Sequence, residues 1–281
     1  MTLILGMSKA DGVYMSTDYR VTNAVTGKLI DDDSVKFLTI HYPPDEGGPT
    51  VLMAYTGLAR LRDREKTPMA TWIRSTLRGE TDVIDPSMAH LKTRLDRDIA
   101  PYGVGLIINM FVVEPARRLF GAFTNVKADW SVRADFLYHM APLGSPFCFA
   151  NGAGARTVLR DPKLFGLMKS QLEVTPREPK DHMKLLSSIN RRAAALDATV
   201  SPVCQVSFIP ANAKEGVATT VFREKGESAP ITNPSLLFGI DLTDIMEQMG
   251  EEILAQQEGR EVDTDAVARS EVYKRSTERR P

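Results

Sequence analysis

Short apolar runs separated by turn residues open the chain and predict strands. Leucine, isoleucine and methionine dominate residues 3–7, and residues 13–18 form a second run that begins with the apolar Val-Tyr-Met and ends with Ser-Thr-Asp. Ala10, Asp11 and Gly12 lie between the two runs, and an Asp-Gly pair is typical of a tight hairpin turn. A third apolar run at residues 34–40 contains one charged residue, Lys36. The pattern therefore predicts a hairpin followed by a further strand.

The rest of the pattern alternates between strands and helices. Residues 58–77 predict two helical pieces that Pro68 separates. Asp85-Pro86 predicts a helix start with Asp85 as the N-cap, and apolar residues at helical spacing continue to Ile99. The other predicted elements are strands at 50–57, 104–114, 117–126, 130–140, 147–150, 203–210 and 217–222, and helices at 155–170 and 181–196. This order of strands, helices, strands, helices and strands predicts an α+β protein.

The chain changes character after residue 222. Residues 223–233 are polar and predict a linker, and Asn233-Pro234 predicts the start of a helix. Residues 258–281 are charged with both signs interspersed, which is typical of a solvated or frayed helix or of disorder. We therefore predict a domain at 1–222 and a linker with a helical, charged C-terminal extension at 223–281.

Composition indicates a soluble globular protein and gives no sign of a cofactor. The chain has 281 residues, 43% of them hydrophobic and 25% charged, and its net charge of -1 indicates neither a nucleic-acid nor a membrane partner. No apolar run reaches the roughly 20 residues of a membrane span. Two cysteines, Cys148 and Cys204, make no disulfide framework and favour the reducing cytoplasm. The four histidines share no metal-ligand spacing, so we expect no metal and no cofactor.

The start of the chain offers a candidate nucleophile. Removal of Met1, which is usual before a small residue, would leave Thr2 with a hydroxyl and a free α-amine that can accept the hydroxyl proton. No leader is apparent before the first strand, and we expect none. Asp18, at the end of the second run, would lie near Thr2 if the hairpin pairs in register. Lys36 needs a partner if it is buried, and Asp18 is the natural one.

This order of residues resembles the proteasome β-type subunits and their bacterial relatives, which are N-terminal-nucleophile hydrolases. Their pattern is an N-terminal threonine, a hairpin, the motif D-x-R-x-T and a lysine in the next strand. The chain has Thr2, then the motif at residues 18–22, then Lys36. A glycine after a further strand and before a helix completes the first half of the pattern, and Gly57 matches it. The resemblance covers about residues 2–222.

The second half departs from the family pattern at two places. The family has a Gly-Ser-Gly turn before a helix, and the chain has Gly152-Ala153-Gly154, without the serine. The family then has an aspartate and a serine at the end of the next helix. Asp197 and Ser201 match them, but their spacing is one residue longer.

The resemblance implies a fold, a reaction and an assembly. The fold would be a four-layer αββα sandwich of two packed, mainly antiparallel sheets, the N-terminal-nucleophile hydrolase fold. The reaction would be hydrolysis of a peptide or protein by a threonine protease through an acyl-enzyme, without a cofactor. The assembly would be a cytoplasmic, self-compartmentalising homo-oligomer, a ring or stack of rings, and the sequence does not indicate whether an ATPase partner supplies its substrate.

The resemblance also implies a role for each site residue. Thr2 would attack the scissile carbonyl, and Lys36, oriented by Asp18, would lower the pKa of the site. The backbone N–H of Gly57 would stabilise the oxyanion. Asp197 and Ser201 would position the α-amine.

Two other functions remain open from the sequence. The missing serine at Ala153 and the altered spacing of Asp197 and Ser201 favour a catalytically silent, ring-forming relative. A hydrolase of small amides on the same fold is the second alternative. Each site residue also has a purely structural interpretation: Thr2 as an ordinary strand residue, Asp18 as a hairpin cap, Lys36 at a strand edge and Gly57 in a plain turn.

Overall fold

A computed structural model describes residues 2–22, 26, 28–32, 34–43, 48–79, 83–174, 178–211, 216–225, 227 and 234–243. Within these residues the chain is an α+β protein with three sheets, mostly antiparallel, and five α-helices. The predicted class is therefore confirmed. Met1 and residues 244–281, on which other predictions depend, lie outside the described residues.

The first sheet is built around the predicted N-terminal hairpin. Its five strands are antiparallel and lie in the order β10 (Phe147–Gly152), β1 (Leu3–Lys9), β2 (Gly12–Asp18), β11 (Cys204–Pro210) and β12 (Ala218–Phe222). Lys9 pairs with Gly12 across the turn, and Ile4 pairs with Thr17. This register brings the end of β2 beside the start of β1.

The second sheet is larger and has one parallel pair. Its seven strands lie in the order β14 (Ile240–Asp241), β13 (Ser235–Leu237), β5 (Phe37–His41), β6 (Thr50–Thr56), β7 (Ile107–Val113), β8 (Arg118–Val126) and β9 (Val132–Pro142). Only β13 and β5 run parallel among the described strands. A third sheet contains only β3 (Val21–Thr22) and β4 (Leu29–Asp31).

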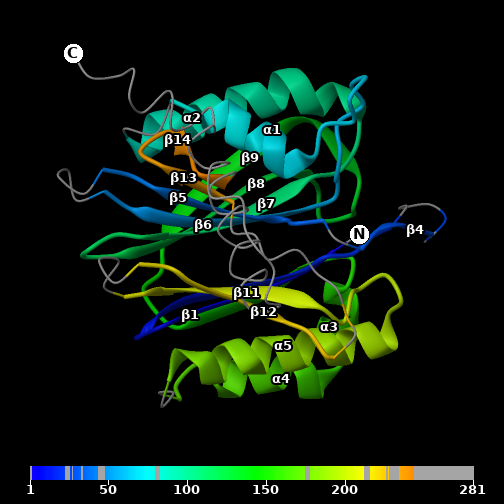
Figure 1. The fold of residues 1–281 in the computed structure, drawn as a ribbon, viewed down its shortest axis with the longest axis vertical. Coiled ribbons are helices and arrows are strands. Elements are labelled where there is room, and N and C mark those ends of the chain that lie inside the picture. The colour runs from blue at the N-terminus through cyan, green and yellow to red at the C-terminus, as the bar shows by residue number, and fades with distance from the viewer. Residues whose placement is uncertain are drawn as a thin grey trace, which may run out of the picture.

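The helices lie beyond the two large sheets, and apolar side chains fill the spaces between. Figure 1 shows α1 (Met69–Leu77) and α2 (Ile84–Arg94) beyond the seven-stranded sheet, and α3 (Ala155–Arg160), α4 (Pro162–Ser170) and α5 (Pro179–Leu196) beyond the five-stranded sheet. A middle core joins residues of both sheets, among them Ile4, Met15, Leu52 and Phe111. Two outer cores join each sheet to its helices.

Several predicted helix boundaries are wrong. The segment at 58–68 forms turns and an Arg60–Pro68 bridge, so residues 58–77, all of them described, contain one helix, α1. Val83 occupies the N-cap of α2, whereas Asp85 lies in its first turn. The single helix predicted at 155–170 is two helices, because Asp161 caps α4 and Pro162 begins it.

Two predictions about strands also need correction. Lys36 lies immediately before β5 and not within the strand, since β5 begins at Phe37. The helix predicted from Asn233-Pro234 is replaced at residues 235–241 by β13 and β14. The division of the chain at residue 222 stays a prediction.

Candidate active site

A buried carboxylate, Asp18, is the centre of the candidate site. It is the last residue of β2, and its side chain has no exposed surface. Its Oδ1 accepts a hydrogen bond from the Leu3 N–H at 3.1 Å, and its Oδ2 accepts one from the Ser201 N–H at 2.9 Å. Asp18 therefore ties the residue after Thr2 to the segment that follows α5.

Lys36 is the charged partner of Asp18, as the sequence predicts. Its Nζ lies 3.2 Å from Asp18 Oδ1, and its side chain is 2% exposed. The same ammonium donates to the backbone carbonyls of Asp18 at 2.9 Å and Arg20 at 2.6 Å. These three acceptors match the three N–H donors of an ammonium group.

Burial shifts the pKa of both members of this pair. It raises the pKa of the Asp18 carboxyl, while the charge of Lys36 and the Ser201 and Leu3 N–H groups oppose that shift. It lowers the pKa of the Lys36 ammonium, while Asp18 opposes that shift. Each group therefore needs the other in order to stay charged, because burying an isolated charge costs far more free energy than burying an ion pair.

Arg20 holds the segment after α5 in place. Its guanidinium binds Asp32 through two hydrogen bonds, of 2.9 and 2.8 Å. Its third nitrogen donates to the backbone carbonyls of Ala198 at 2.9 Å and Val200 at 3.2 Å. Since Ser201 follows directly, Arg20 fixes the backbone that donates to Asp18.

A glycine turn lies against Thr2. Thr2 is 3% exposed, and its carbonyl accepts the Gly154 N–H at 3.4 Å. Gly152 has a φ of +89°, and a Cβ at this position would lie 2.1 Å from the Thr2 carbonyl oxygen. Only glycine permits this approach. The turn is further held by Asn151, whose side chain accepts the Gly152 N–H and donates across to Asn109 of β7.

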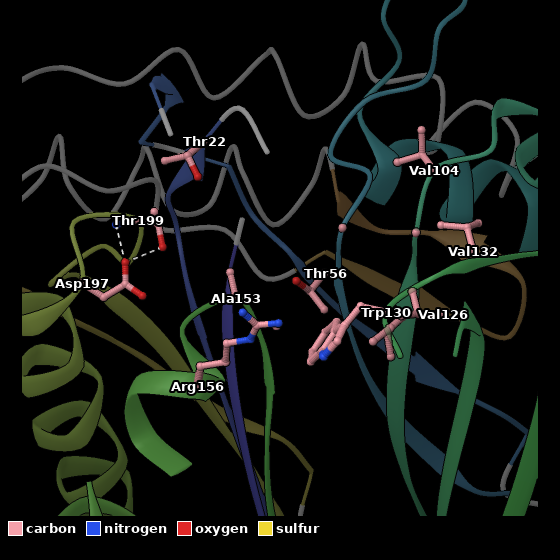
Figure 2. A pocket seen from close by; sticks show the side chains of 14 residues that line it. Thr22, Thr56, Val104, Val126, Trp130, Val132, Ala153, Arg156, Asp197 and Thr199 are labelled. Carbon is pink, nitrogen blue, oxygen red and sulfur yellow. Dashed lines mark hydrogen bonds between the residues drawn. The ribbon is translucent and has the colours of Figure 1, made fainter. Parts of the chain in front are cut away.

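A cavity of about 490 Å³ opens beside this turn. Figure 2 shows Thr22, Thr56, Ala153 and Arg156 facing it. Its apolar wall comes from the second sheet, the segment before β7 and the turn between β8 and β9, and consists of Val104, Ile107, Val126, Trp130 and Val132. Because Gly152 and Ala153 form part of its lining, the cavity lies next to the Thr2 backbone.

Gly57, the predicted oxyanion residue, lines the same cavity. Its φ is +110°, and a Cβ there would lie 2.1 Å from the Gly105 carbonyl oxygen. The position therefore requires glycine for local backbone reasons. The oxyanion role of its N–H stays a prediction.

Asp197 and Ser201, the remaining predicted residues, have separate environments. Asp197 lines the cavity, and its carboxylate accepts hydrogen bonds from the Thr199 N–H at 2.9 Å, the Thr199 hydroxyl at 2.6 Å and the Thr157 hydroxyl at 3.2 Å. Ser201 is 2% exposed, and its hydroxyl accepts the Val203 N–H at 3.3 Å. Ser201 thus joins the Asp18 cluster through its backbone, whereas Asp197 organises the cavity wall.

Three further residues build the site and were not predicted from the sequence. Asn190 of α5 donates to the Ser201 carbonyl at 2.8 Å. Arg156 and Trp130 line the cavity, with the guanidinium carbon 4.9 Å from the centre of the Trp130 ring. Arg156 is the second residue of α3 and follows Ala153 of the glycine turn by three positions, a signal that was available, whereas nothing in the local pattern indicates Trp130.

Within the described residues, no group of His, Cys, Asp and Glu side chains is arranged to hold a metal ion. In that part of the chain, no helix is both long and apolar enough to cross a membrane. No protein-family model matches the sequence, and no curated protein is significantly similar to it.

Proposed function

We propose that the protein is an N-terminal threonine hydrolase, a proteasome-like peptidase with Thr2 as its nucleophile. In this proposal the two sheets and their outer helices correspond to the four-layer αββα sandwich of the N-terminal-nucleophile hydrolases. The family assignment rests on the resemblance of residues 2–222 together with the geometry around Asp18.

One observation carries the proposal. The Leu3 N–H, the Lys36 ammonium and the Ser201 N–H, which come from three separate parts of the chain, all donate to the Asp18 carboxylate, and Leu3 is one residue from the candidate nucleophile. An ordinary surface hairpin has no need of a fully buried ion pair at its open end, because burying two charges is costly. Removal of Met1 would give Thr2 a free α-amine next to its hydroxyl, and a cation near these groups would favour a deprotonated nucleophile.

The proposed reaction is amide hydrolysis in two steps. The Thr2 Oγ attacks the scissile carbonyl, its α-amine accepts the proton, and the Gly57 N–H stabilises the oxyanion. The C–N bond then breaks, and the leaving amine takes the proton from the α-ammonium. Water attacks the resulting Thr2 ester, which releases the acid and restores the hydroxyl.

The cavity supports a peptide or protein as the substrate. Its apolar wall and its polar residues on the facing side provide the mixed lining that small-molecule and peptide sites use. By resemblance, the active form is a cytoplasmic homo-oligomer with such sites facing an inner chamber.

Ala153 favours a second candidate function, a catalytically silent, ring-forming relative. It lines the cavity in place of the family's serine, so one hydroxyl of the expected machinery is missing. The mature N-terminus separates the two candidates, because retained Met1 would block the α-amine and leave the site silent.

Intact-mass measurement and substitution of Thr2 test the proposal. We expect a mass that begins at Thr2, and an acyl adduct of one equivalent after incubation with a peptide β-lactone. Thr2→Ala should lower peptide hydrolysis at least about a thousandfold, because the nucleophile itself is removed. Thr93→Ala, which removes an exposed hydroxyl on α2, should leave the rate unchanged. Wild-type activity in Thr2→Ala would exclude Thr2 as the nucleophile.

A further inference from the structure

Arg156 is the charged side chain at the cavity whose hydrogen-bond donors have no partner among the described residues. Among the described residues, two charged ones line the cavity, Arg156 and Asp197. The Asp197 carboxylate is occupied by the three hydrogen bonds from Thr157 and Thr199. In the part of the chain that the structure describes, neither residue forms an ion pair, and the Arg156 side chain, unlike that of Asp197, forms no hydrogen bond with the protein. The Arg156 guanidinium is therefore the charged group at the cavity whose hydrogen-bonding capacity is left for a ligand.

Trp130 holds this guanidinium at the cavity. The Arg156 Cζ lies 4.9 Å from the centre of the Trp130 ring, which is the geometry of a cation–π contact. Figure 2 shows the two side chains pointing toward one another from α3 and from the turn between β8 and β9. Stacking on an aromatic ring leaves the N–H edge of a guanidinium available for two parallel hydrogen bonds to a carboxylate.

The backbone at Trp130 is strained in a way that favours this placement. Trp130 has a φ of +67° and is 54% exposed, although tryptophan is a large apolar residue. A bulky residue in the left-handed region is a true outlier, and such strain is concentrated at ligand-binding sites. The neighbouring apolar wall, Val104, Val126 and Val132, lowers the local dielectric and strengthens a charge-assisted hydrogen bond.

We propose that Arg156, presented by Trp130, binds a carboxylate of the substrate while the valine wall receives an adjacent apolar side chain. The substrate class is thus an acidic peptide, whose carboxylate belongs either to a Glu or Asp side chain or to a free C-terminus. This inference rests on the proposed hydrolase function, because it assigns specificity to the cavity beside Thr2. Arg156 acts in binding and not in the chemical step.

Binding measured without turnover tests the proposal. We would titrate the full-length Thr2→Ala variant by calorimetry with acetylated pentapeptides that differ only in Glu or Gln, and with one neutral pentapeptide carrying either a free or an amidated C-terminus. We expect one of the carboxylate peptides to bind at least about tenfold more tightly than its neutral match, the worth of a charge-assisted hydrogen bond. The pair that shows the difference identifies the source of the carboxylate.

Substitutions at the two residues then assign the effect. Arg156→Gln should abolish the preference and leave the affinity for the neutral peptides within twofold, whereas Arg160→Gln, an exposed arginine on the same helix outside the cavity, should preserve it. Trp130→Gly should weaken carboxylate binding while keeping or raising the melting temperature, since glycine relieves the positive φ.

Equal binding of charged and neutral peptides, or no binding at millimolar concentration, would overturn the proposal. An equal loss of affinity for charged and neutral peptides in Arg156→Gln would also overturn it. An inactive wild-type protein that still selects carboxylate peptides would refute the hydrolase function and leave this binding site standing.

Discussion

The buried Asp18–Lys36 pair fixes the backbone of several chain segments around it. Lys36 satisfies its three N–H donors with Asp18 and Arg20, and Asp18 in turn holds two backbone N–H groups. A buried pair of this kind is weak evidence for stability, because desolvation offsets most of the attraction. Under the proposed function, the pair would serve the chemistry of Thr2 and not the stability of the fold.

Substitution of the pair separates these two explanations. Lys36→Met should lower the free energy of unfolding by about 3–5 kcal/mol, because Asp18 becomes an uncompensated buried charge. The double variant Asp18→Asn/Lys36→Met should recover at least half of this loss but none of the hydrolase activity. Urea unfolding and peptide hydrolysis measure the two effects. Lys92→Met, which breaks an ion pair with Asp96 that is 38% and 32% exposed, should cost less than about 1 kcal/mol. A fully active double variant would exclude Lys36 from the mechanism.

A second buried lysine, Lys9, lies at the opposite end of β1 and has a structural role. It is 2% exposed, and its ammonium donates to the carbonyl of Gln171 at 2.7 Å and to that of Val174. Its Nζ also lies 2.8 Å from His182 Nε2. Since an ammonium only donates, His182 accepts there in its neutral form.

Acid should destabilise the protein through His182. Burial, followed by the charge of Lys9, lowers the pKa of His182 below its ordinary value. Near pH 6.5 the unfolded chain therefore binds a proton at His182 that the folded chain does not bind. The free energy of unfolding falls as the pH decreases through this range. Between pH 7.5 and 5.5 we expect a loss of at most about 1.4 kcal/mol per pH unit from this residue, measured by urea unfolding.

Two variants check this assignment. His182→Gln should flatten the pH dependence, with a remnant from His41, whose pKa burial also lowers. His139→Gln, at an exposed position, should keep the wild-type dependence. An unchanged pH profile in His182→Gln would contradict the linkage.

At the scale of elements, short sequence patterns correctly predicted those features that depend on neighbouring residues. The Asp-Gly turn and two apolar runs predicted the β1–β2 hairpin, and the cost of a buried lysine predicted the partner of Lys36. The Asp161-Pro162 pair carries the same start signal as Asp85-Pro86, so the break between α3 and α4 was also predictable. At Asp85 the signal was correct only to within two residues, because α2 begins earlier, at Ile84.

Elements and contacts that depend on distant parts of the chain were not predictable from the pattern. Residues 235–237 form a strand because they pair with Thr39, Ile40 and His41, almost two hundred residues earlier. Apolar residues in a short segment fit a helix or a strand equally well, and the distant partner decides. The contact of Arg156 with Trp130 likewise joins a helix to a turn between strands, and no periodicity relates the two.

At the scale of the whole molecule, three apolar cores hold the layers around the site. The middle core joins the two sheets, and the outer cores fix the helices that carry Arg156 and Asn190. The cavity lies where β6 and β10 end and β7 begins, so its walls come from both sheets. Any change that shifts one sheet against the other should therefore alter substrate binding as well as stability.

The strand β13 extends this framework into the segment after residue 222. Leu236 has no exposed surface and belongs to the core between the seven-stranded sheet and α1 and α2. Thr39 donates its backbone N–H to the Pro234 carbonyl at 2.9 Å, which continues the pairing beyond the strand. A detachable extension would not place a residue in the core of the preceding domain.

Substitution of Leu236 tests whether this segment is part of the folded unit. Leu236→Ala should lower the free energy of unfolding by about 2–5 kcal/mol, because it leaves a cavity in a packed core. Ile240→Ala removes apolar atoms from the neighbouring strand, but Ile240 is 39% exposed, so its cost should stay below about 1 kcal/mol. Urea unfolding of the two variants gives the comparison. Small and equal losses of unfolding free energy in the two variants would indicate that residues 234–243 belong to a separate extension. A large loss only at Leu236 would place the domain boundary beyond β14, because a residue that the core needs cannot belong to a dispensable tail.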